Sequence, residues 1–140
     1  MPLESLPAEF LFTMTANIAD KAPAMVGAVN GGTRMVFTAM SGTFEGPKLR
    51  GVIADVAGGD WVMIRADRVA DLNVRLCLQT DDGATIFLQY TGMNIKGVIR
   101  VAIRFEAGDE RYTWLNSVQA VGLGTSGTGI VSYDVYALTY

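Results

Sequence analysis

Apolar and polar residues alternate with a period of two along most of this 140-residue chain, and no segment carries a sustained apolar stripe of helical period. The alternation is clearest in ADLNVRLCLQT, residues 70–80, where one face carries Leu72, Val74, Leu76 and Leu78. Successive side chains of a β-strand point to opposite faces, so this pattern predicts strands with one buried face. We therefore expect an all-β chain with little helix.

Turn sequences rich in glycine, asparagine and aspartate separate the alternating segments, as in NGG at residues 30–32 and DDG at residues 81–83. They delimit nine predicted strands, at residues 9–18, 33–43, 48–56, 61–65, 70–80, 85–93, 99–106, 111–123 and 130–140. This spacing suits an antiparallel meander, and closure into a β-barrel removes the edges that such apolar strands would otherwise expose. A length of 140 residues suits a single barrel domain over residues 1–140.

The charge balance and the scarcity of metal-binding residues exclude several classes of function. A net charge of −3 with scattered Lys and Arg argues against a nucleic-acid partner. With no histidine and the single cysteine Cys77, the usual zinc and iron sites cannot be built, and catalytic triads are disfavoured. No apolar run approaches the ~20 residues of a spanning helix, and the acidic N-terminal segment is unlike a signal peptide. We expect no metal, no membrane partner and a cytoplasmic location.

The string GLGTSG, residues 122–127, fits the G-x-G-x-x-G fingerprint of dinucleotide-binding folds. That fingerprint requires a following helix whose N-terminus receives the pyrophosphate. Here the alternating segment IVSYDVYALTY follows, so we interpret the string as part of a glycine-rich hairpin loop and expect no cofactor.

Several short strings together resemble one protein family in their order and spacing. They are GTFEGPKLRG, GGDW, ADLNVRLCLQTDDGATI, YTWLN and VSYDVYAL. The chain thereby resembles the DUF3237 family, also called UPF0311, and the resemblance implies a calycin-like closed barrel. It also implies a link to a few fungal relatives that resemble cyclases adding a hydroxyl across a reactive double bond. The chain departs from the family pattern at Ser41–Gly42, where two glycines are usual, and at Asp67–Arg68, where Asp-Gly is usual.

The candidate catalytic residues are Asp60, Asp71 and Arg75, with Asn73 as a substrate-binding neighbour. Asp60 lies where a turn enters a strand, so it is either a capping carboxylate or a functional one. The polar face of residues 70–80 either meets solvent or lines a cavity. We predict that it looks into the barrel, toward Trp114 and Asp60, because Asp71 and Arg75 in an apolar cavity would be tolerated for function.

Aromatic and amide residues complete the predicted substrate site. Tyr112, Trp114 and Asn116 alternate on one face of the strand predicted at residues 111–123, where they could hold a flat organic ligand. Tyr90 lies on a strand that is apolar on nearly both faces. The alternative for Trp114 is a plain core position, and for Tyr90, Tyr133 and Tyr136 an ordinary structural role.

These features favour a small-molecule enzyme, a cofactor-independent lyase, isomerase or cyclase. In it an Asp desolvated among aromatic residues acts as general acid or base on an aromatic or unsaturated carbonyl substrate. The competing hypothesis is a carrier barrel with the same cavity and no turnover. A third is a structural oligomer, and a homodimer or higher homo-oligomer stays open for any of the three.

Overall fold

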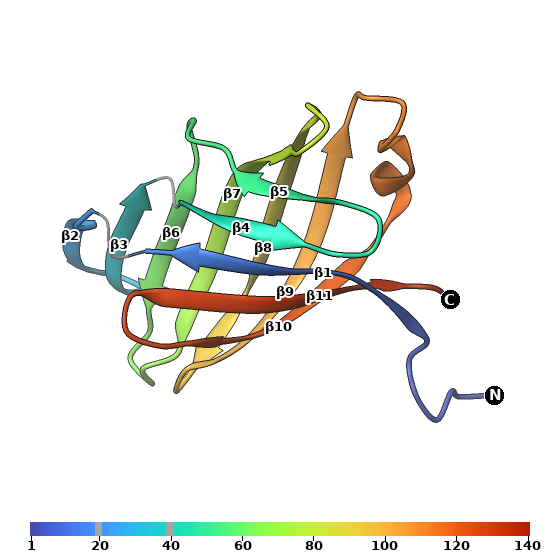
Figure 1. Cartoon of the computed structure of the whole chain (residues 1–140). Helices are drawn as coiled ribbons and strands as arrows, with labels where there is room; N and C mark the ends of the chain where they lie inside the picture. Colours follow the sequence, from blue (N-terminus) through green and yellow to red (C-terminus); the bar gives the residue numbers. More distant parts are fainter. Residues whose placement is uncertain (19–20, 39–40) are drawn as a thin grey trace.

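The computed structural model describes residues 1–18, 21–38 and 41–140, and Figure 1 shows that they form strands wrapped around a common interior. The strands are β1 (Ala8–Asn17), β2 (Ala24–Val29), β3 (Gly32–Thr38), β4 (Ser41–Glu45), β5 (Arg50–Ile53), β6 (Gly59–Ile64), β7 (Ala70–Thr80), β8 (Thr85–Ile95), β9 (Val98–Ala107), β10 (Ala120–Ser126) and β11 (Ile130–Leu138). The one helical element within the described ranges is a short 3₁₀ helix, η1 (Thr113–Ser117). The all-β prediction is confirmed.

The predicted closed antiparallel barrel is confirmed, but it is formed by eight strands and not by all nine predicted ones. Its order is β7-β5-β4-β1-β11-β10-β9-β8, and the long pairing of β8 back onto β7 closes the ring. The first and last strands of the chain are neighbours, with Ala8 opposite Leu138. Closure leaves these eight strands with no free edge, which suits their apolar inner faces.

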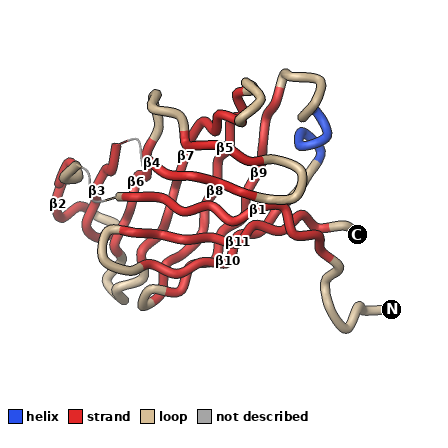
Figure 2. The backbone as a smooth tube through the Cα atoms, viewed as in Figure 1, coloured by secondary structure: helices blue, strands red, loops and turns tan. Residues whose placement is uncertain are grey.

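One edge of β7 is shared by two other strands. Its C-terminal part pairs with β5, with Gly51 opposite Thr80, and its N-terminal part pairs with β6, with Asp60 opposite Val74. Strand β6 in turn pairs with β3, and β3 with β2. These three strands form an extension beside the barrel at the end opposite η1, as the tube in Figure 2 shows.

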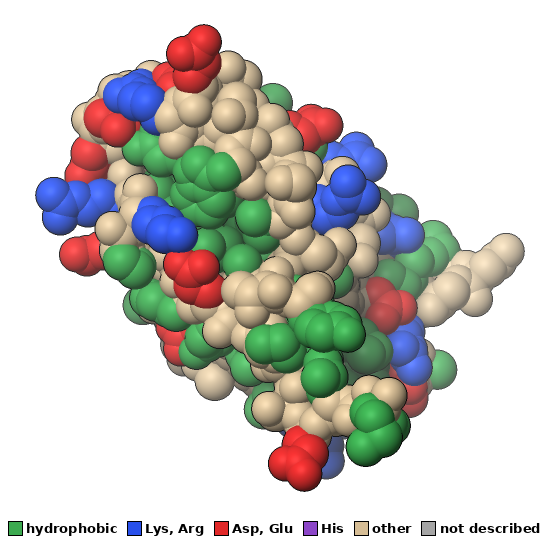
Figure 3. All heavy atoms as spheres, turned by 90° about the vertical axis from the view of Figure 1, so that its right-hand side faces the viewer, with side chains coloured by type: hydrophobic (Ala, Val, Ile, Leu, Met, Phe, Trp, Pro, Cys, Tyr) green, Lys and Arg blue, Asp and Glu red, His purple; other side chains and the backbone are tan. Residues whose placement is uncertain are grey.

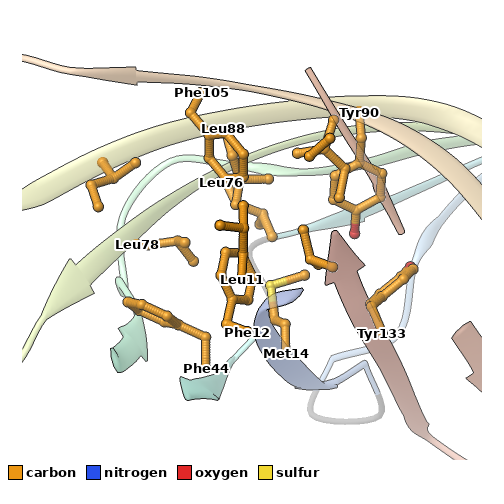
Figure 4. Packing of buried hydrophobic residues seen from close by; sticks show 14 of the residues in the cluster. Leu11, Phe12, Met14, Phe44, Leu76, Leu78, Leu88, Tyr90, Phe105 and Tyr133 are labelled. Atoms are coloured by element: carbon orange, nitrogen blue, oxygen red, sulfur yellow. The ribbon is translucent and has the colours of Figure 1, made fainter. Parts of the chain in front are cut away.

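The apolar face of each alternating strand fills the barrel interior. On β7 the buried side chains are Leu72, Val74, Leu76 and Leu78, and on β9 they are Ile99, Val101, Ile103 and Phe105. In Figure 4, Phe44 and Leu78 lie toward one end of this core and Tyr90 and Tyr133 toward the other. Burial of the apolar faces is the main stabilising contribution to a barrel of this kind.

Two strand predictions need correction. The segment predicted as one strand at residues 33–43 forms β3 and β4, and residues 39–40 between them lie outside the described residues; β2 was not predicted at all. The segment predicted as a strand at residues 111–123 contains η1 before β10. Its buried or partly buried residues recur every third position, at Tyr112, Leu115 and Val118, because backbone bonds Leu115 N to Tyr112 O and Val118 N to Leu115 O wind it as a 3₁₀ helix.

The glycine-rich string at residues 122–127 has no helix after it. Its first half lies in β10 and its second half begins the hairpin to β11, closed by Gly127 N donating to Ile130 O. The prediction of a hairpin loop holds for the second half. No helix in the described part of the chain is long and apolar enough to cross a membrane.

Candidate functional site

A row of side chains from four neighbouring strands crosses the barrel interior beside the β6-β3-β2 extension. Tyr90 on β8 is opposite Val74 on β7, Val74 is opposite Asp60 on β6, and Asp60 is opposite Phe37 on β3. Residues directly opposite each other in a sheet place their side chains on the same face. Since Val74 and Tyr90 are buried in the core, the row brings the Asp60 carboxyl to the inner face.

Close backbone packing and one hydrogen bond hold Asp60 in place. It follows Gly58 and Gly59, and a Cβ at Gly59 would lie 2.1 Å from the carbonyl oxygen of Phe37, so only glycine allows this approach of β6 to β3. The Asp60 Oδ1 atom accepts a hydrogen bond of 3.1 Å from the Asn73 backbone N–H. Asp60 thus does satisfy a backbone group, as the capping interpretation expected, but from the inside of the barrel.

Burial dominates the electrostatics of Asp60. It raises the pKa of this carboxyl from 3.8 to about 6, and the opposing hydrogen bond from Asn73 recovers only part of the shift. A carboxyl with such a pKa exchanges a proton near neutral pH, which is what a general acid or base requires.

Two tyrosines, Tyr90 and Tyr133, lie in contact at the same end of the core. Their ring centroids are 5.5 Å apart and the planes meet at 63°, an edge-to-face arrangement. Figure 4 shows both hydroxyl groups at the end of the core away from Phe44 and Leu78. Among the described residues, the Tyr90 hydroxyl is the one buried side-chain polar atom that makes no hydrogen bond of good geometry, although the Tyr133 hydroxyl lies close enough to interact with it. A buried hydroxyl without a good hydrogen bond lowers the stability of the folded chain unless a water or a ligand accepts its hydrogen bond.

The tyrosine hydroxyls stay protonated at any ordinary pH. Burial raises the pKa of Tyr133 to about 12, and the negative charge of Asp60 adds to the effect. Burial first, and then Tyr133 and Asp60, raise the pKa of Tyr90 well above its usual value of 10. Both hydroxyls are therefore hydrogen-bond donors at neutral pH.

Small residues in β10 make room for Tyr133. Gly124 is directly opposite Tyr133, and a Cβ there would lie 2.4 Å from the Ser132 carbonyl oxygen and 3.0 Å from Tyr133 Cδ1. A Cβ at Gly122 would lie 2.7 Å from Val101 Cγ2. Gly124, with Gly122 beside it, therefore leaves the space in which the Tyr133 ring lies.

Partly buried apolar side chains surround these polar groups. They include Phe37, opposite Asp60; Met35, opposite the buried Val62; and Ile64, opposite Ala70. Complete burial is reached deeper in the barrel, at Val74 and Leu76. This end of the interior is thus apolar and incompletely covered, with Asp60, Tyr90 and Tyr133 as its polar groups.

The prediction that Asp71, Asn73 and Arg75 look into the barrel is wrong. Their face is the outer one, because the alternate residues of β7 fill the interior. Asp71 is paired with Arg65 at 3.4 Å, and the Arg75 guanidinium lies over the Trp61 ring at 5.9 Å. Asn73 is exposed and lines a shallow outer hollow of about 240 Å³. An interior filled by Leu and Val leaves no room for a polar ladder.

The predicted group of Tyr112, Trp114 and Asn116 lies at the opposite end of the barrel, in and beside η1, and does not share one strand face. The Tyr112 hydroxyl donates to the Asp82 carboxylate at 2.7 Å, Trp114 Nε1 donates to Arg111 O, and Asn116 bonds both backbone groups of Ala107. These are structural contacts that tie η1 to the barrel. They separate the three residues from Asp60.

Figure 3 views the η1 end and shows Lys and Arg interspersed with Asp and Glu around apolar side chains. A hollow of about 410 Å³ there is lined by Lys48, Arg50, Asp81, Asp82 and Tyr112. Its charges are already paired in part, through Arg50 with Asp81 and Arg111 with Asp82. The candidate site is therefore at the other end of the barrel.

Tyr133 is the site residue that was not predicted. Its signal was present in VSYDVYAL, where it shares the apolar face with Val131, Val135 and Ala137. Cys77 lies on the partly exposed outer side of β7. Within the described ranges no three His, Cys, Asp or Glu side chains lie close enough together to hold a metal ion.

Comparisons with known proteins place the chain among similar barrels. A family model described as "Protein of unknown function (DUF3237)" matches residues 7–138. A UPF0311 protein of Rhodopseudomonas palustris is 26% identical over 150 residues, covering 94% of this chain and 96% of that protein. The hydroalkoxylation enzyme phnH of Penicillium herquei is 31% identical over 120 residues, covering 81% of this chain and 71% of that protein.

Solved structures agree on the fold. A β-barrel-like protein of Acinetobacter baumannii AYE has a TM-score of 0.89 at 27% identity and covers 99% of each chain. An enzyme of Penicillium herquei has a TM-score of 0.69 at 23% identity, covering 99% of this chain and 98% of that one.

Proposed function

The chain belongs to the DUF3237 family, and we propose that it is a cofactor-independent enzyme that adds a hydroxyl group across a double bond conjugated to a carbonyl. The observation that carries the proposal is the convergence of Asp60 with Tyr90 and Tyr133 inside the barrel. One ionisable carboxyl and two neutral phenols face an incompletely covered apolar end of the interior. The reaction falls within the lyase, isomerase or cyclase class expected from the sequence.

Asp60 is the group that moves the proton. Its carboxylate accepts the proton of the substrate hydroxyl while the hydroxyl oxygen attacks the β-carbon of the double bond. Electrons shift onto the carbonyl oxygen, and the Asp60 carboxyl then returns the proton to the α-carbon. The substrate and the product are isomers when the hydroxyl belongs to the same molecule, so no redox partner is needed. A positioned general acid or base contributes typically 10²–10⁴-fold to the rate.

Tyr90 and Tyr133 stabilise the charge that develops on the carbonyl oxygen. The Tyr90 hydroxyl interacts with the neighbouring Tyr133 hydroxyl but makes no hydrogen bond of good geometry among the described residues, so it can turn to donate to a substrate. Donors held in place in a low-dielectric interior stabilise an oxyanion strongly, because they need no reorganisation during the reaction. The aromatic and aliphatic side chains around them suit an aromatic or polyene body.

The likeness to the Penicillium hydroalkoxylation enzyme supports this reaction type. Hydroalkoxylation is the addition of an alcohol O–H across a carbon–carbon double bond, and it needs proton transfer without a change in oxidation state overall. A carboxyl with a pKa near neutrality is suited to that transfer.

Turnover of a panel of hydroxyl-bearing enones and alkenyl phenols, followed by chromatography, tests the proposal. We expect Asp60→Asn to lower kcat/KM by about 10²-fold or more. Asparagine keeps an oxygen that can accept the Asn73 N–H, so this change removes the proton transfer and preserves the backbone contact. Below about pH 6 the wild-type rate should fall as Asp60 is protonated and can no longer act as the base.

Asp71→Asn is the matched control, since Asp71 is a carboxylate on the outer face of the neighbouring strand. We expect its kcat/KM to stay within about twofold of wild type. A loss of rate in Asp71→Asn equal to that in Asp60→Asn would contradict the assignment of Asp60. Binding of the panel compounds without any turnover would favour a carrier barrel over an enzyme.

A further inference from the structure

The charges around the candidate site are distributed unevenly. Asp60 is packed between β3 and β7, whose inward residues beside it are Phe37 and Val74, and its other polar neighbours are Tyr90 and Tyr133. None of the described residues that face Asp60 from these elements is a lysine or arginine. Within the described ranges, the inner end of the barrel therefore carries one acidic group and no lysine or arginine to balance a second negative charge.

Three arginines near the candidate site, Arg34, Arg65 and Arg75, make their side-chain contacts on the outside. The Arg34 guanidinium donates to the Trp61 carbonyl oxygen at 2.9 Å, and Arg65 pairs with Asp67 and Asp71. Arg75 lies over the outer face of the Trp61 ring. These three guanidinium groups would have to leave their present contacts before they could balance the charge of an anionic ligand beside Asp60.

The donors and acceptors of Asp60, Tyr90 and Tyr133 further restrict which ligands can bind. Two phenol groups can donate and the Asp60 carboxylate can only accept. A molecule with a hydroxyl to donate to Asp60 and an oxygen to accept from Tyr90 satisfies all of them. An ammonium group could pair with the Asp60 carboxylate, but it offers donors only, so it cannot accept a hydrogen bond from Tyr90, and its charge is costly to desolvate in an apolar interior.

We infer that the site formed by Asp60, Tyr90 and Tyr133 takes an uncharged hydroxyl-bearing or hydroxy-carbonyl compound and rejects carboxylates, phosphates and amines. The inference rests on the proposed function in assigning the same three residues to the site, but it concerns binding and does not require turnover. It excludes substrates presented as coenzyme A thioesters, nucleotides or sugar phosphates if those anionic groups must enter the barrel.

The inference has a pH signature. A neutral phenol brings no charge, so its affinity should be nearly constant where Asp60 is ionised. A carboxylate beside an ionised Asp60 must bind together with a proton, because two negative charges in an apolar interior repel each other strongly. Its affinity should therefore fall by about tenfold for each pH unit above the pKa of Asp60.

Three compounds with one aromatic body provide the test: 2-naphthol, 2-naphthoate and 2-naphthylmethylammonium. Their dissociation constants are measured by isothermal titration calorimetry on the full chain between about pH 6 and pH 8, a range in which a phenol stays protonated. We expect 2-naphthol to bind at least about tenfold more tightly than either charged compound at pH 8. Tyr90→Phe should weaken 2-naphthol binding by about fivefold or more.

Asp60→Asn identifies the source of the discrimination. With the acidic group removed, 2-naphthoate should bind more tightly than to wild type, and its affinity should no longer depend on pH. Arg75→Met is the matched control and should leave all three affinities unchanged, because Arg75 lies outside the barrel.

Tighter binding of 2-naphthoate or of the ammonium compound than of 2-naphthol to wild type would overturn the inference. So would a preference for 2-naphthol over 2-naphthoate that Asp60→Asn leaves intact. Selective binding of 2-naphthol without turnover of the enone panel would sustain this inference and count against the proposed enzyme, so the two failures are distinguishable.

Discussion

At the scale of single residues, Asp60 is held by two opposing effects. Burial disfavours its charge, while the Asn73 N–H favours it, and burial prevails so that the pKa is raised to about 6. At neutral pH this carboxyl is ionised while buried, and that destabilises the folded chain. Such a residue is expected at a functional site more often than at a structural one.

The stability of the wild-type chain relative to Asp60→Asn should depend on pH in a defined direction. The folded-state pKa of about 6 exceeds the unfolded value of 3.8, so the folded chain holds its proton longer as pH rises. Below about pH 4, Asp60 is largely neutral in both the folded and the unfolded chain. Its destabilising effect grows between about pH 4 and pH 6 and reaches its full size above about pH 6. We expect Asp60→Asn to gain on the order of 2–3 kcal/mol relative to wild type across that window.

Urea denaturation of both proteins at pH 4 and pH 7.5 measures this difference, since all other titrations are common to the two. Equal pH dependence in Asp60→Asn and wild type would mean that Asp60 is not desolvated.

Arg68 adopts a backbone conformation that favours glycine. Its φ is +68°, in the left-handed region where a side chain is strained, which fits the glycine that the resemblance to the family implies here. Arg68→Gly should raise the free energy of unfolding by about 0.5–1 kcal/mol, measured by urea denaturation. Arg68→Ala, which removes the long side chain but keeps the strain, should leave stability nearly unchanged. Stabilisation by both substitutions alike would assign the effect to the arginine side chain.

At the scale of elements, β10 matters through its inward glycines. Gly124→Ala places a methyl group 2.4 Å from the Ser132 carbonyl oxygen and 3.0 Å from the Tyr133 ring, so β10 or the ring must move. We expect a loss of about 1–3 kcal/mol in stability and of about tenfold in kcat/KM. Leu123→Ala changes an outward, exposed residue of the same strand and should affect neither measurably. Full activity in Gly124→Ala would separate Tyr133 from the reaction.

The η1 element has a structural role at the far end. Tyr112→Phe removes the hydrogen bond to Asp82, which also accepts from Thr80 Oγ1 at 2.6 Å. We expect the Tm to fall by roughly 3 °C while kcat/KM stays within about twofold of wild type. Differential scanning calorimetry and the turnover assay measure the two effects. A large loss of activity at unchanged Tm would restore Tyr112 to the site.

At the scale of the whole molecule, the barrel joins its two ends through continuous strand pairing. Trp61 lies in β6 beside the candidate site and Trp114 lies in η1 at the other end, and the chain contains no other tryptophan. Long strands such as β7, β8 and β9 pair along their full lengths between these ends. Unfolding one end therefore breaks pairing that the other end needs.

We expect the Trp61→Phe and Trp114→Phe chains, each with one remaining tryptophan, to give coincident urea unfolding curves by fluorescence and by circular dichroism once normalised. Refolding should take milliseconds to seconds, because pairings such as β1 with β11 join distant parts of the chain. An earlier transition reported by Trp61 alone would mean that the β6-β3-β2 extension unfolds separately.

The sequence by itself determined the strand content and which face of each strand is apolar. Period-two alternation is a local property, so residues such as Leu72 and Val74 identify the buried face of β7 without knowledge of any partner. The turn sequences fixed most strand ends for the same reason. The period-two interpretation was wrong at residues 111–123. There the sequence also fits a three-residue period over Tyr112, Leu115 and Val118, which is the period of the 3₁₀ helix.

Only the tertiary structure decided where the polar groups meet. The sequence pointed to Asp60 and Tyr90 separately, but their convergence with Tyr133 depends on the registers of β6 with β7, β7 with β8, and the closure of the ring. The register between two strands is set by packing over the whole barrel, and the sequence of either strand alone does not specify it. Packing also decided that Asp71 and Arg75 face outward, because the barrel interior has room for one set of side chains and the apolar set gains more from burial.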